Sequence, residues 1–463
     1  MKPTDWLGLS LAVASGVILV MVTLNTPVPA SDLPGYLAMA RDGVLDVDVG
    51  TWAEGREFVN GSWLYQRAAW ELFQLGGWEL LVALNALAVA GALVLVGRVG
   101  WERGRGVGAG VAVLIASLLM MQNTAMRPQT AAFLLAALVL WAPRTWHVGV
   151  LTILWANVHG SFVLAPALAG IRARDPWRVG VAALAWLANP FGWELLSYVF
   201  DNSSLPAERG LDEWSATPLL SPIGLRLFCA LAVGLGLAIK RRPPVFEVIV
   251  AGVLAVLALT AVRHVAWLGL VLGPLVAGWL PRAPAGQSRF ARVVFLAVAA
   301  VALCGIVRFL PWLRAPPTSR AEDAWLEPQA PVEVLSALDQ LDPGEVLVPF
   351  AVGGLVRWRH PRWRVPVDVR VWLYSDAEWA AYERTRSSPA ALVLVDRHRE
   401  SGLDRHTGHW VVLAEDGRWS LRSPPEEVPV PEVPLPDEPL PAELLERLDD
   451  LDDIRGLAAP TPP

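Results

Sequence analysis

Long apolar stretches, separated by short polar or proline-containing segments, dominate the first 310 residues of the chain. A helix that crosses a bilayer needs about 20 consecutive apolar residues. Several stretches reach this length, and others are short enough to be half-helices or tilted helices. We therefore predict about eleven membrane-embedded helices. They cover residues 6–26, 78–99, 107–122, 128–141, 148–158, 162–171, 179–188, 222–239, 245–262, 265–280 and 291–310.

The segment between the first two apolar stretches has its own pattern. Residues 33–41 and 63–75 carry apolar side chains at helical spacing, together with aromatic residues that suit a membrane surface. We predict that both segments form helices lying at the interface between membrane and water.

The pattern changes after Pro311, where hydrophobicity falls and short runs typical of strands begin. Asp416-Gly417 between two of these runs predicts a hairpin turn. The predicted strands cover residues 346–350, 365–369, 391–395, 410–414 and 418–421. From residue 424 onward, proline alternates with acidic residues and valine, which predicts a disordered tail with one short helix at 442–451.

The predicted fold class is therefore an α-helical polytopic membrane protein with a small α/β domain and a disordered, acidic, proline-rich tail. The expected domains are 1–311 for the multi-span part, 312–423 for the soluble part and 424–463 for the tail. Composition agrees, because 54% of the 463 residues are hydrophobic, 18% are charged and the mean hydropathy is +0.42. These values exclude a water-soluble globular fold of this length.

The formal net charge is -6, but the distribution of charges along the chain is more informative than the total. It indicates an orientation in the membrane, not a nucleic-acid partner. With a cytoplasmic N-terminus, eleven basic residues of the loops fall on the cytoplasmic side, as the positive-inside rule requires. These residues are Arg98, Arg103, Arg105, Arg144, Arg172, Arg174, Lys240, Arg241, Arg242, Arg282 and Arg289. The α/β domain is then expected outside the cytoplasm.

Polar groups that are costly at membrane depth gather where the predicted helices meet the outer side. They include Asp32, Arg127, Asn157, His159, Asn189, Glu194, Glu213, Arg263 and His264. Asp32 could serve as a general base, or it could cap the helix that begins at Leu33-Pro34. Arg127 and the pair Arg263-His264 could hold a phosphate, or they could anchor the chain to lipid headgroups.

His159 lies in the segment Trp155-Ala156-Asn157-Val158-His159-Gly160, which predicts a broken helix pair. Its alternative role is structural, with Asn157 and His159 satisfying backbone groups of a turn. No metal-ligand spacing, glycine-rich phosphate loop or catalytic triad order is present in the sequence. A divalent metal could be held by Asp32, Asp48 or Glu213, but their spacing does not require one.

Taken in order, these features resemble the C-type glycosyltransferase superfamily of membrane enzymes, and within it a widespread, poorly characterised bacterial membrane-protein family. The resemblance covers residues 32–421. It is carried by Asp32 with Gly43 and Asp48, Phe58-Val59-Asn60, Trp63-Leu64, Arg127-Pro128-Gln129, Trp155 to Gly160, Asn189-Pro190-Phe191-Gly192, Glu213-Trp214, Arg263-His264, Gly353-Gly354 and Val367-Asp368-Val369-Arg370.

The resemblance implies transfer of a sugar from a polyprenyl-phosphate donor to an envelope acceptor on the outer side of a bacterial cytoplasmic membrane. Asp32 would be the catalytic base, and Arg127, Asn157, His159, Arg263 and His264 would hold the donor. Asp48, Asn60, Trp63, Asn189, Glu213 and Trp214 would be further members of the site. One departure stands out, because similar sequences tend to have His-Glu where this chain has Gly61-Ser62.

Two alternatives belong to other classes of protein. The first is a non-catalytic envelope scaffold that binds a protein partner through the C-terminal domain or tail. The second is a transporter, which is disfavoured because the predicted helices carry few charges near the bilayer midplane, Glu247 being the nearest exception.

Overall fold

The computed structural model describes residues 3–43, 45–201, 205–281, 292–293, 295–296, 298–299, 325–387, 389 and 391–425. The chain is mostly helical and divides into two compact units. Unit 1 comprises Met1–Thr26 and Leu72–Ser319, and unit 2 comprises Pro27–Glu71 and Arg320–Pro463. The predicted tail from residue 426 onward and most of the predicted helix at 291–310 lie outside the described residues.

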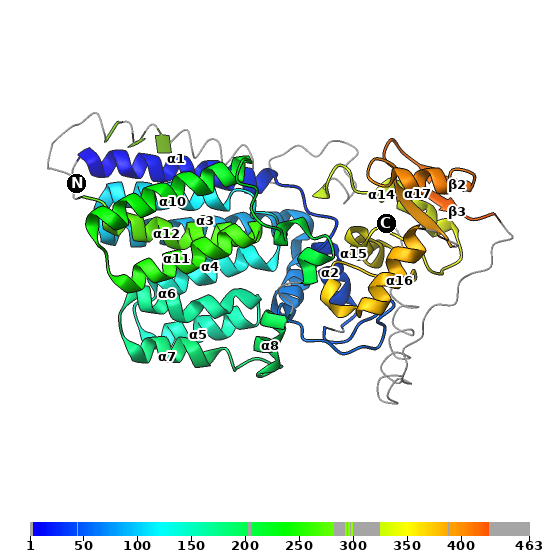
Figure 1. The fold of residues 1–463 in the computed structure, drawn as a ribbon, viewed down its shortest axis with the longest axis horizontal. Helices are drawn as coiled ribbons and strands as arrows, with labels where there is room; N and C mark the ends of the chain where they lie inside the picture. Colours follow the sequence, from blue (N-terminus) through cyan, green and yellow to red (C-terminus); the bar gives the residue numbers. More distant parts are fainter. Residues whose placement is uncertain are drawn as a thin grey trace. The chain divides into compact units, whose positions relative to one another are not determined.

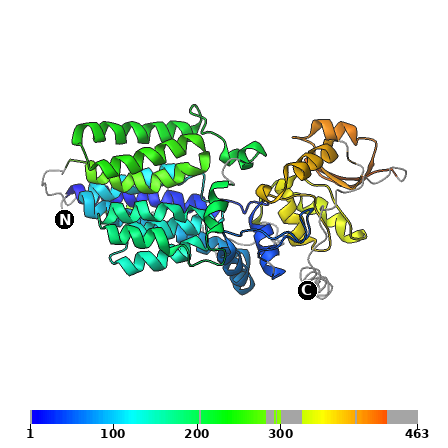
Figure 2. The ribbon, with the colours of Figure 1, turned by 60° about the horizontal axis from the view of Figure 1, so that its bottom comes forward.

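Unit 1 is a bundle of helices whose axes run side by side in both ribbon views (Figures 1 and 2). The long helices are α1 (Pro3–Asn25), α3 (Trp63–Met120), α4 (Pro128–Trp141), α5 (Thr145–Ala156), α10 (Pro222–Arg241), α11 (Val245–Thr260) and α12 (Val265–Trp279), and the first turns of α3, up to Glu71, belong to unit 2. The shorter helices α6 (Ala165–Arg172) and α7 (Pro176–Ala185) lie between α5 and α10 in the chain. Short helices α8 (Glu194–Asp201) and α9 (Leu205–Glu208) connect α7 to α10. Each of these long helices overlaps a predicted apolar stretch.

Helix α3 contains three of the predicted helices in one element. Its backbone leaves helical geometry at Gly76–Gly77 and again at Gly104–Arg105, where Arg105 has a φ of 60°. The breaks separate residues 63–75, 78–103 and 106–120, close to the predicted 63–75, 78–99 and 107–122. A side chain added at Gly100 would meet the backbone of Gly108 at 2.7 Å, so the last two segments form an antiparallel hairpin.

Small residues let α12 pack directly on the backbone of α3. A Cβ atom at Gly273 would lie 2.5 Å from the carbonyl oxygen of Ala112, and one at Gly269 would lie 2.7 Å from the Cβ of Leu119. The four-residue spacing Gly269, Gly273, Ala277 is the small-residue pattern of close helix packing in membranes. This motif, which the sequence analysis missed, places α12 at the centre of unit 1, where nearly all its residues are buried.

The outer surface of unit 1 is apolar, as expected of a bundle surrounded by lipid. On α10 and α11, Leu225, Phe228, Val253 and Val256 are all at least half exposed. Four helices are long and apolar enough to cross a membrane, namely Pro3–Asn25, Trp63–Met120, Pro222–Arg241 and Val262–Trp279. Helices α4, α5, α6 with its preceding turn, and α11 are apolar but shorter, so the predicted number of spans stays a prediction.

Unit 2 is built from two distant parts of the chain. Helix α2 (Leu33–Arg41) packs on α15 (Phe350–Arg359), where Gly35 and Gly354 approach so closely that a Cβ on Gly354 would meet the Gly35 nitrogen at 3.1 Å. Arg41 also donates to the carbonyl oxygens of Arg357 and Trp358. Most of α2 is buried, so the helix predicted at 33–41 is present but is a core element of unit 2.

A three-stranded antiparallel sheet lies near the end of the described chain, in the order β1-β3-β2. Its strands are β1 (Val393–Asp396), β2 (Val411–Glu415) and β3 (Trp419–Ser423). Three predicted strands and the turn at Asp416-Gly417 are thus confirmed within a few residues. The predictions at 346–350 and 365–369 were wrong, because the first segment makes only an isolated bridge, Leu347 with Val393, and the second forms neither strand nor bridge. Helices α14 (Val332–Leu335), α16 (Asp376–Ser387) and α17 (Ser401–His406) complete unit 2.

Candidate functional site

A cluster of charged and aromatic residues lies at the end of unit 1 where α4 and α12 begin. Arg127 immediately precedes α4, Glu213 is in the 3-10 helix η2 (Asp212–Trp214), and Arg263 is in the 3-10 helix η3 (Val262–His264). One carboxylate oxygen of Glu213 forms an ion pair with Arg127, and the other lies 3.5 Å from Nη1 of Arg263. We call this end of the bundle the Glu213 end.

The two arginines lower the pKa of Glu213 and keep it ionised. Burial alone would raise the pKa of this carboxyl, but the guanidinium groups of Arg263 and Arg127 outweigh that effect and lower it. Glu213 is therefore an ionised acceptor at neutral pH. Two cations converge on one carboxylate, which is the arrangement that can also receive the oxygens of a phosphate.

The position of Arg263 is fixed by an aromatic ring and by the backbone. Its guanidinium carbon lies 4.1 Å from the centre of the Trp214 ring, a cation-π contact. Gln129 donates to the carbonyl oxygen of Arg263 at 3.2 Å, and the Val262 N–H donates to Ser215 at 3.1 Å. These contacts join η2, η3 and the start of α4 into one rigid layer.

His159 lies in the turn between α5 and the 3-10 helix η1 (Gly160–Leu164). Its Nδ1 accepts a hydrogen bond from the Ser161 N–H at 3.1 Å, and the Ser161 hydroxyl lies 2.7 Å from the same atom. Burial, assisted by the charge of Arg263, lowers the pKa of His159 to about 3. The ring is therefore neutral, and because Nδ1 is an acceptor, the proton is on Nε2.

His264 is oriented by the backbone of the preceding helix. Its Nδ1 lies 3.0 Å from the carbonyl oxygen of Leu257, and its ring meets Trp214 edge to face at 6.1 Å. His159 and His264 thus both lie at the Glu213 end, as predicted candidates for donor binding. The Nδ1 atom of each is hydrogen-bonded to a nearby backbone group, the Ser161 N–H for His159 and the Leu257 carbonyl for His264.

Asn157 and Asn189 have structural roles in the structure. Asn157 is buried and donates to the carbonyl oxygens of Ile153 and Ala188. Asn189 donates to the carbonyl oxygens of Trp186 and Gly192 and accepts from the Phe191 N–H, which closes a turn. The structural alternative for the Trp155–Gly160 segment therefore holds for Asn157, whereas His159 keeps a ring nitrogen that the turn does not use.

Asp32 belongs to unit 2 and stands at the N-cap position of α2. Its carboxylate makes no capping hydrogen bond, and the first turn of the helix contains a proline. The simple capping explanation for an aspartate at this position is therefore not supported. Tyr65 lies near enough for the Asp32 charge to act on its hydroxyl.

Asp48 is a structural residue of unit 2. It is fully buried, accepts from Thr51, and lies 2.5 Å from Nη2 of Arg370. Arg370 also pairs with Asp368 at 2.6 Å, and Arg357 reaches the same carboxylate at 2.9 Å. Two buried carboxylates thus face two buried guanidinium groups. The charges balance, which makes this a cluster that joins the two parts of unit 2.

Asn60 and Trp63 mark the start of α3. The Asn60 side chain accepts from the Ser62 N–H at 3.1 Å and exchanges hydrogen bonds with Gln66, and the Trp63 N–H donates to the Asn60 carbonyl. Gly61-Ser62, where the resemblance leads to an expectation of His-Glu, forms this turn. The described residues contain no group of three or more His, Cys, Asp or Glu side chains suited to hold a metal ion.

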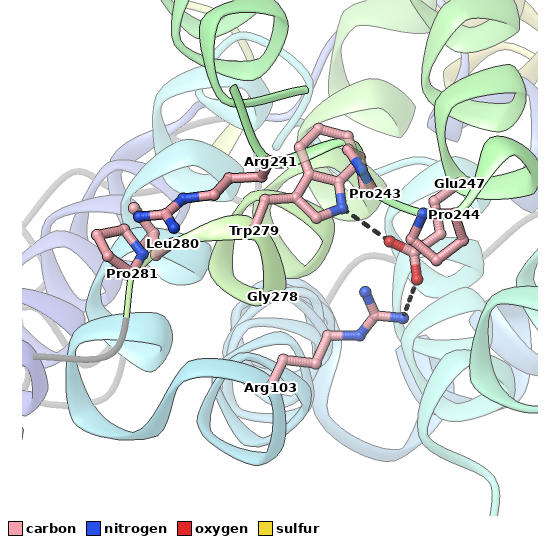
Figure 3. Close-up of a pocket in the computed structure, with 9 residues that line it drawn as sticks. All are labelled: Arg103, Arg241, Pro243, Pro244, Glu247, Gly278, Trp279, Leu280 and Pro281. Atoms are coloured by element: carbon pink, nitrogen blue, oxygen red, sulfur yellow. Dashed lines mark hydrogen bonds and ion pairs between the residues drawn. The ribbon is translucent and has the colours of Figure 1, made fainter. Parts of the chain in front are cut away.

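A second charged site, at the opposite end of α11 and α12, was not predicted as a site. Glu247, which the sequence analysis noted only in connection with transport, accepts from Arg103 and from the Trp279 indole there (Figure 3). The signal was present as an acidic residue inside the apolar stretch 245–262, but its partners come from residues that are distant in sequence.

Comparisons with known proteins do not add a family. No protein-family model matches the chain, and no curated protein matches it. The functional proposal therefore depends on the geometry of the Glu213 end and on the resemblance stated above.

Proposed function

We propose that the chain is a membrane glycosyltransferase that binds a polyprenyl-phosphate sugar at the Glu213 end of unit 1. The observation that carries the proposal is the convergence of Arg127 and Arg263 on Glu213, close to the neutral ring of His159. A phosphodiester carries one negative charge and several acceptor oxygens. It suits two guanidinium groups and one imidazole N–H donor.

The cluster also suits the rest of such a donor. The Trp214 ring lies beside Arg263, and the buried Trp267 ring packs beside His159, with the two ring centres 6.1 Å apart. Aromatic faces bind the apolar faces of sugar rings and polyprenyl chains. The apolar outer surface of the bundle gives a lipid-linked ligand a route from the bilayer.

In this proposal Asp32 is the general base that takes a proton from the acceptor nucleophile. The nucleophile forms the new bond to the anomeric carbon, the bond to the phosphate oxygen breaks, and polyprenyl phosphate leaves with inversion. The activated donor supplies its own leaving group, so no ATP is needed. The role of Asp32 and the location on the outer side of a bacterial cytoplasmic membrane come from the resemblance and the positive-inside pattern.

Native mass spectrometry of the full chain in detergent, with a panel of polyprenyl-phosphate sugars, tests this function. We expect the wild type and Asp32→Asn to bind the same donor, and only the wild type to release polyprenyl phosphate when acceptor is present. No donor binding by either form would exclude the enzyme and direct attention to the alternative below.

The alternative is a non-catalytic envelope protein that binds a partner through unit 2. It is favoured by one observation, the edge strand β2, on which Val411 and Val412 are about half exposed. An exposed strand edge can pair with an extended segment of another chain. If this is the function, Val411→Lys removes partner binding and Asp32→Asn has no effect.

A further inference from the structure

A pocket of about 730 Å³ opens at the end of unit 1 opposite the Glu213 end. It lies where α10 ends, α11 begins and α12 ends, beside the bend of α3 at Gly104–Arg105. Helix α12 separates this pocket from Arg263 by 15 residues, or roughly 22 Å at about 1.5 Å per residue. The pocket is therefore distinct from the proposed donor site.

One wall of the pocket is a closed hydrogen-bond network. Glu247 accepts from Nη2 of Arg103 at 3.0 Å and from the Trp279 indole at 2.8 Å. Arg103 also donates to the carbonyl oxygen of Ile171 and lies across Gly278, where a Cβ would come within 3.3 Å of its Nη1. The buried carboxylate is thus neutralised, and the wall is rigid before any ligand arrives.

The opposite wall has a different character. In Figure 3 the Arg241 side chain points away from Glu247, toward the part of the pocket lined by Leu280 and Pro281. Among the described residues, no carboxylate forms an ion pair with Arg241, which is exposed like Lys240 and Arg242 beside it. This wall joins a positive charge to an apolar surface.

We infer that this pocket binds the phosphate headgroup of an anionic phospholipid. The phosphate oxygens meet the Arg241 guanidinium, and the glycerol and upper acyl carbons lie on Trp279, Leu280 and Pro281. The shared chemistry is a phosphate ester, which a soluble phosphate compound could also supply, but the apolar lining at the end of a membrane helix favours the lipid. The paired Arg103 and Glu247 keep the pocket open and in shape.

The test uses native mass spectrometry of the full chain, without donor, to compare phosphatidylglycerol, phosphatidylcholine and glycerol phosphate. The wild type is expected to retain one phosphatidylglycerol in preference to phosphatidylcholine. Arg241→Gln should weaken phosphatidylglycerol retention about tenfold, the equivalent of about 1.4 kcal/mol. Lys240→Gln, which removes the same charge from the neighbouring residue outside the pocket, should change it by less than about twofold.

Equal retention by the wild type and Arg241→Gln, or equal losses in both variants, would overturn the inference, because binding would then need no pocket. Retention of glycerol phosphate as strong as that of the lipid would overturn the lipid assignment. Arg263→Ala should keep phosphatidylglycerol retention unchanged, so that failure of the donor site and failure of this pocket are distinguishable.

Discussion

The Nδ1 atom of His159 accepts a hydrogen bond from the backbone N–H of Ser161, two residues further along the chain, at 3.1 Å. This contact determines the tautomer, because an atom that accepts from an amide cannot carry the ring proton. The Nε2–H then remains as a donor at a site where Arg263 already supplies positive charge. His159 can thus bind a phosphate as a neutral donor, without adding a third cation.

The first prediction concerns pH. Because the folded-state pKa of His159 is lowered to about 3, well below the ordinary value of 6.5, the ring stays neutral between about pH 5 and pH 8. A phosphodiester does not titrate in this range either. Donor affinity of the wild type should therefore not show a transition near 6.5, as measured by native mass spectrometry across this range. A midpoint near 6.5 that disappears in His159→Gln would contradict the neutral-donor role.

The second prediction concerns the Glu213 ion pairs. Glu213→Gln leaves Arg127 and Arg263 without the carboxylate between them, and we expect it to lower the free energy of unfolding by about 1–3 kcal/mol. The matched control is Glu71→Gln, since Glu71 forms an exposed pair with Arg67 at 3.0 Å. That change should cost less than about 0.5 kcal/mol. Thermal unfolding of the purified chain measures both, and equal shifts would refute a special role for Glu213.

The third prediction concerns helix packing. A Cβ at Gly273 would lie 2.5 Å from the Ala112 carbonyl oxygen, whereas a Cβ at Gly252 on α11 would meet no atom within 4 Å. Gly273→Ala should therefore destabilise unit 1 by about 1–3 kcal/mol. Gly252→Ala should be neutral or stabilise by up to about 1 kcal/mol, because alanine has the higher helix propensity. Detergent-unfolding curves that fail to separate the two variants would show that α3 and α12 do not pack this closely.

The fourth prediction concerns acid. Burial alone would raise the pKa of Asp368, but the charges of Arg370 and Arg357 lower it to about 2 from an ordinary 3.8. Its contribution to stability is therefore complete above about pH 4 and lost as the pH falls toward 2, and it amounts to roughly 2 kcal/mol.

Hydrogen–deuterium exchange of peptides covering α15, corrected for intrinsic rates, should show this loss in the wild type. In Asp368→Asn, protection should be lower at pH 5 and should depend less on pH below that value. The exposed Asp342→Asn serves as the control and should behave as the wild type does. The same acid profile in the wild type and Asp368→Asn would assign the loss to other groups.

Much of unit 1 could be read from local sequence. Apolar runs located the long helices within a few residues, because each helix is bounded by a proline, a charge or a glycine pair such as Gly76–Gly77. The number of membrane crossings could not be read in the same way, since helices such as Thr145–Ala156 are too short to span by length alone. Which residues of neighbouring helices face each other could not be predicted either, because contacts such as that of Gly273 with Ala112 join residues that are distant in sequence.

The candidate site was predictable in part for the same reason. Arg127, Glu213 and Arg263 were singled out as costly charges, and the structure joins them, but their pairing was not foreseen. Asp48 was assigned to the site through the resemblance, yet it forms a buried ion pair with Arg370, which lies 322 residues away. Val365–Val369 was predicted as a strand from its composition, but it belongs to no sheet among the described residues. The buried Asp368 in this segment pairs instead with Arg370 and Arg357.

Donor binding at the Glu213 end is tested by the affinity of the full chain for a polyprenyl-phosphate sugar in Arg263→Ala and Arg226→Ala. Arg226 lies on α10 at the same end of unit 1 and donates to Gln122, so it controls for the loss of an arginine there. We expect at least about tenfold weaker donor binding in Arg263→Ala and nearly unchanged binding in Arg226→Ala. Unchanged binding in Arg263→Ala, or equal losses in both variants, would contradict a donor-phosphate site at the Glu213 end.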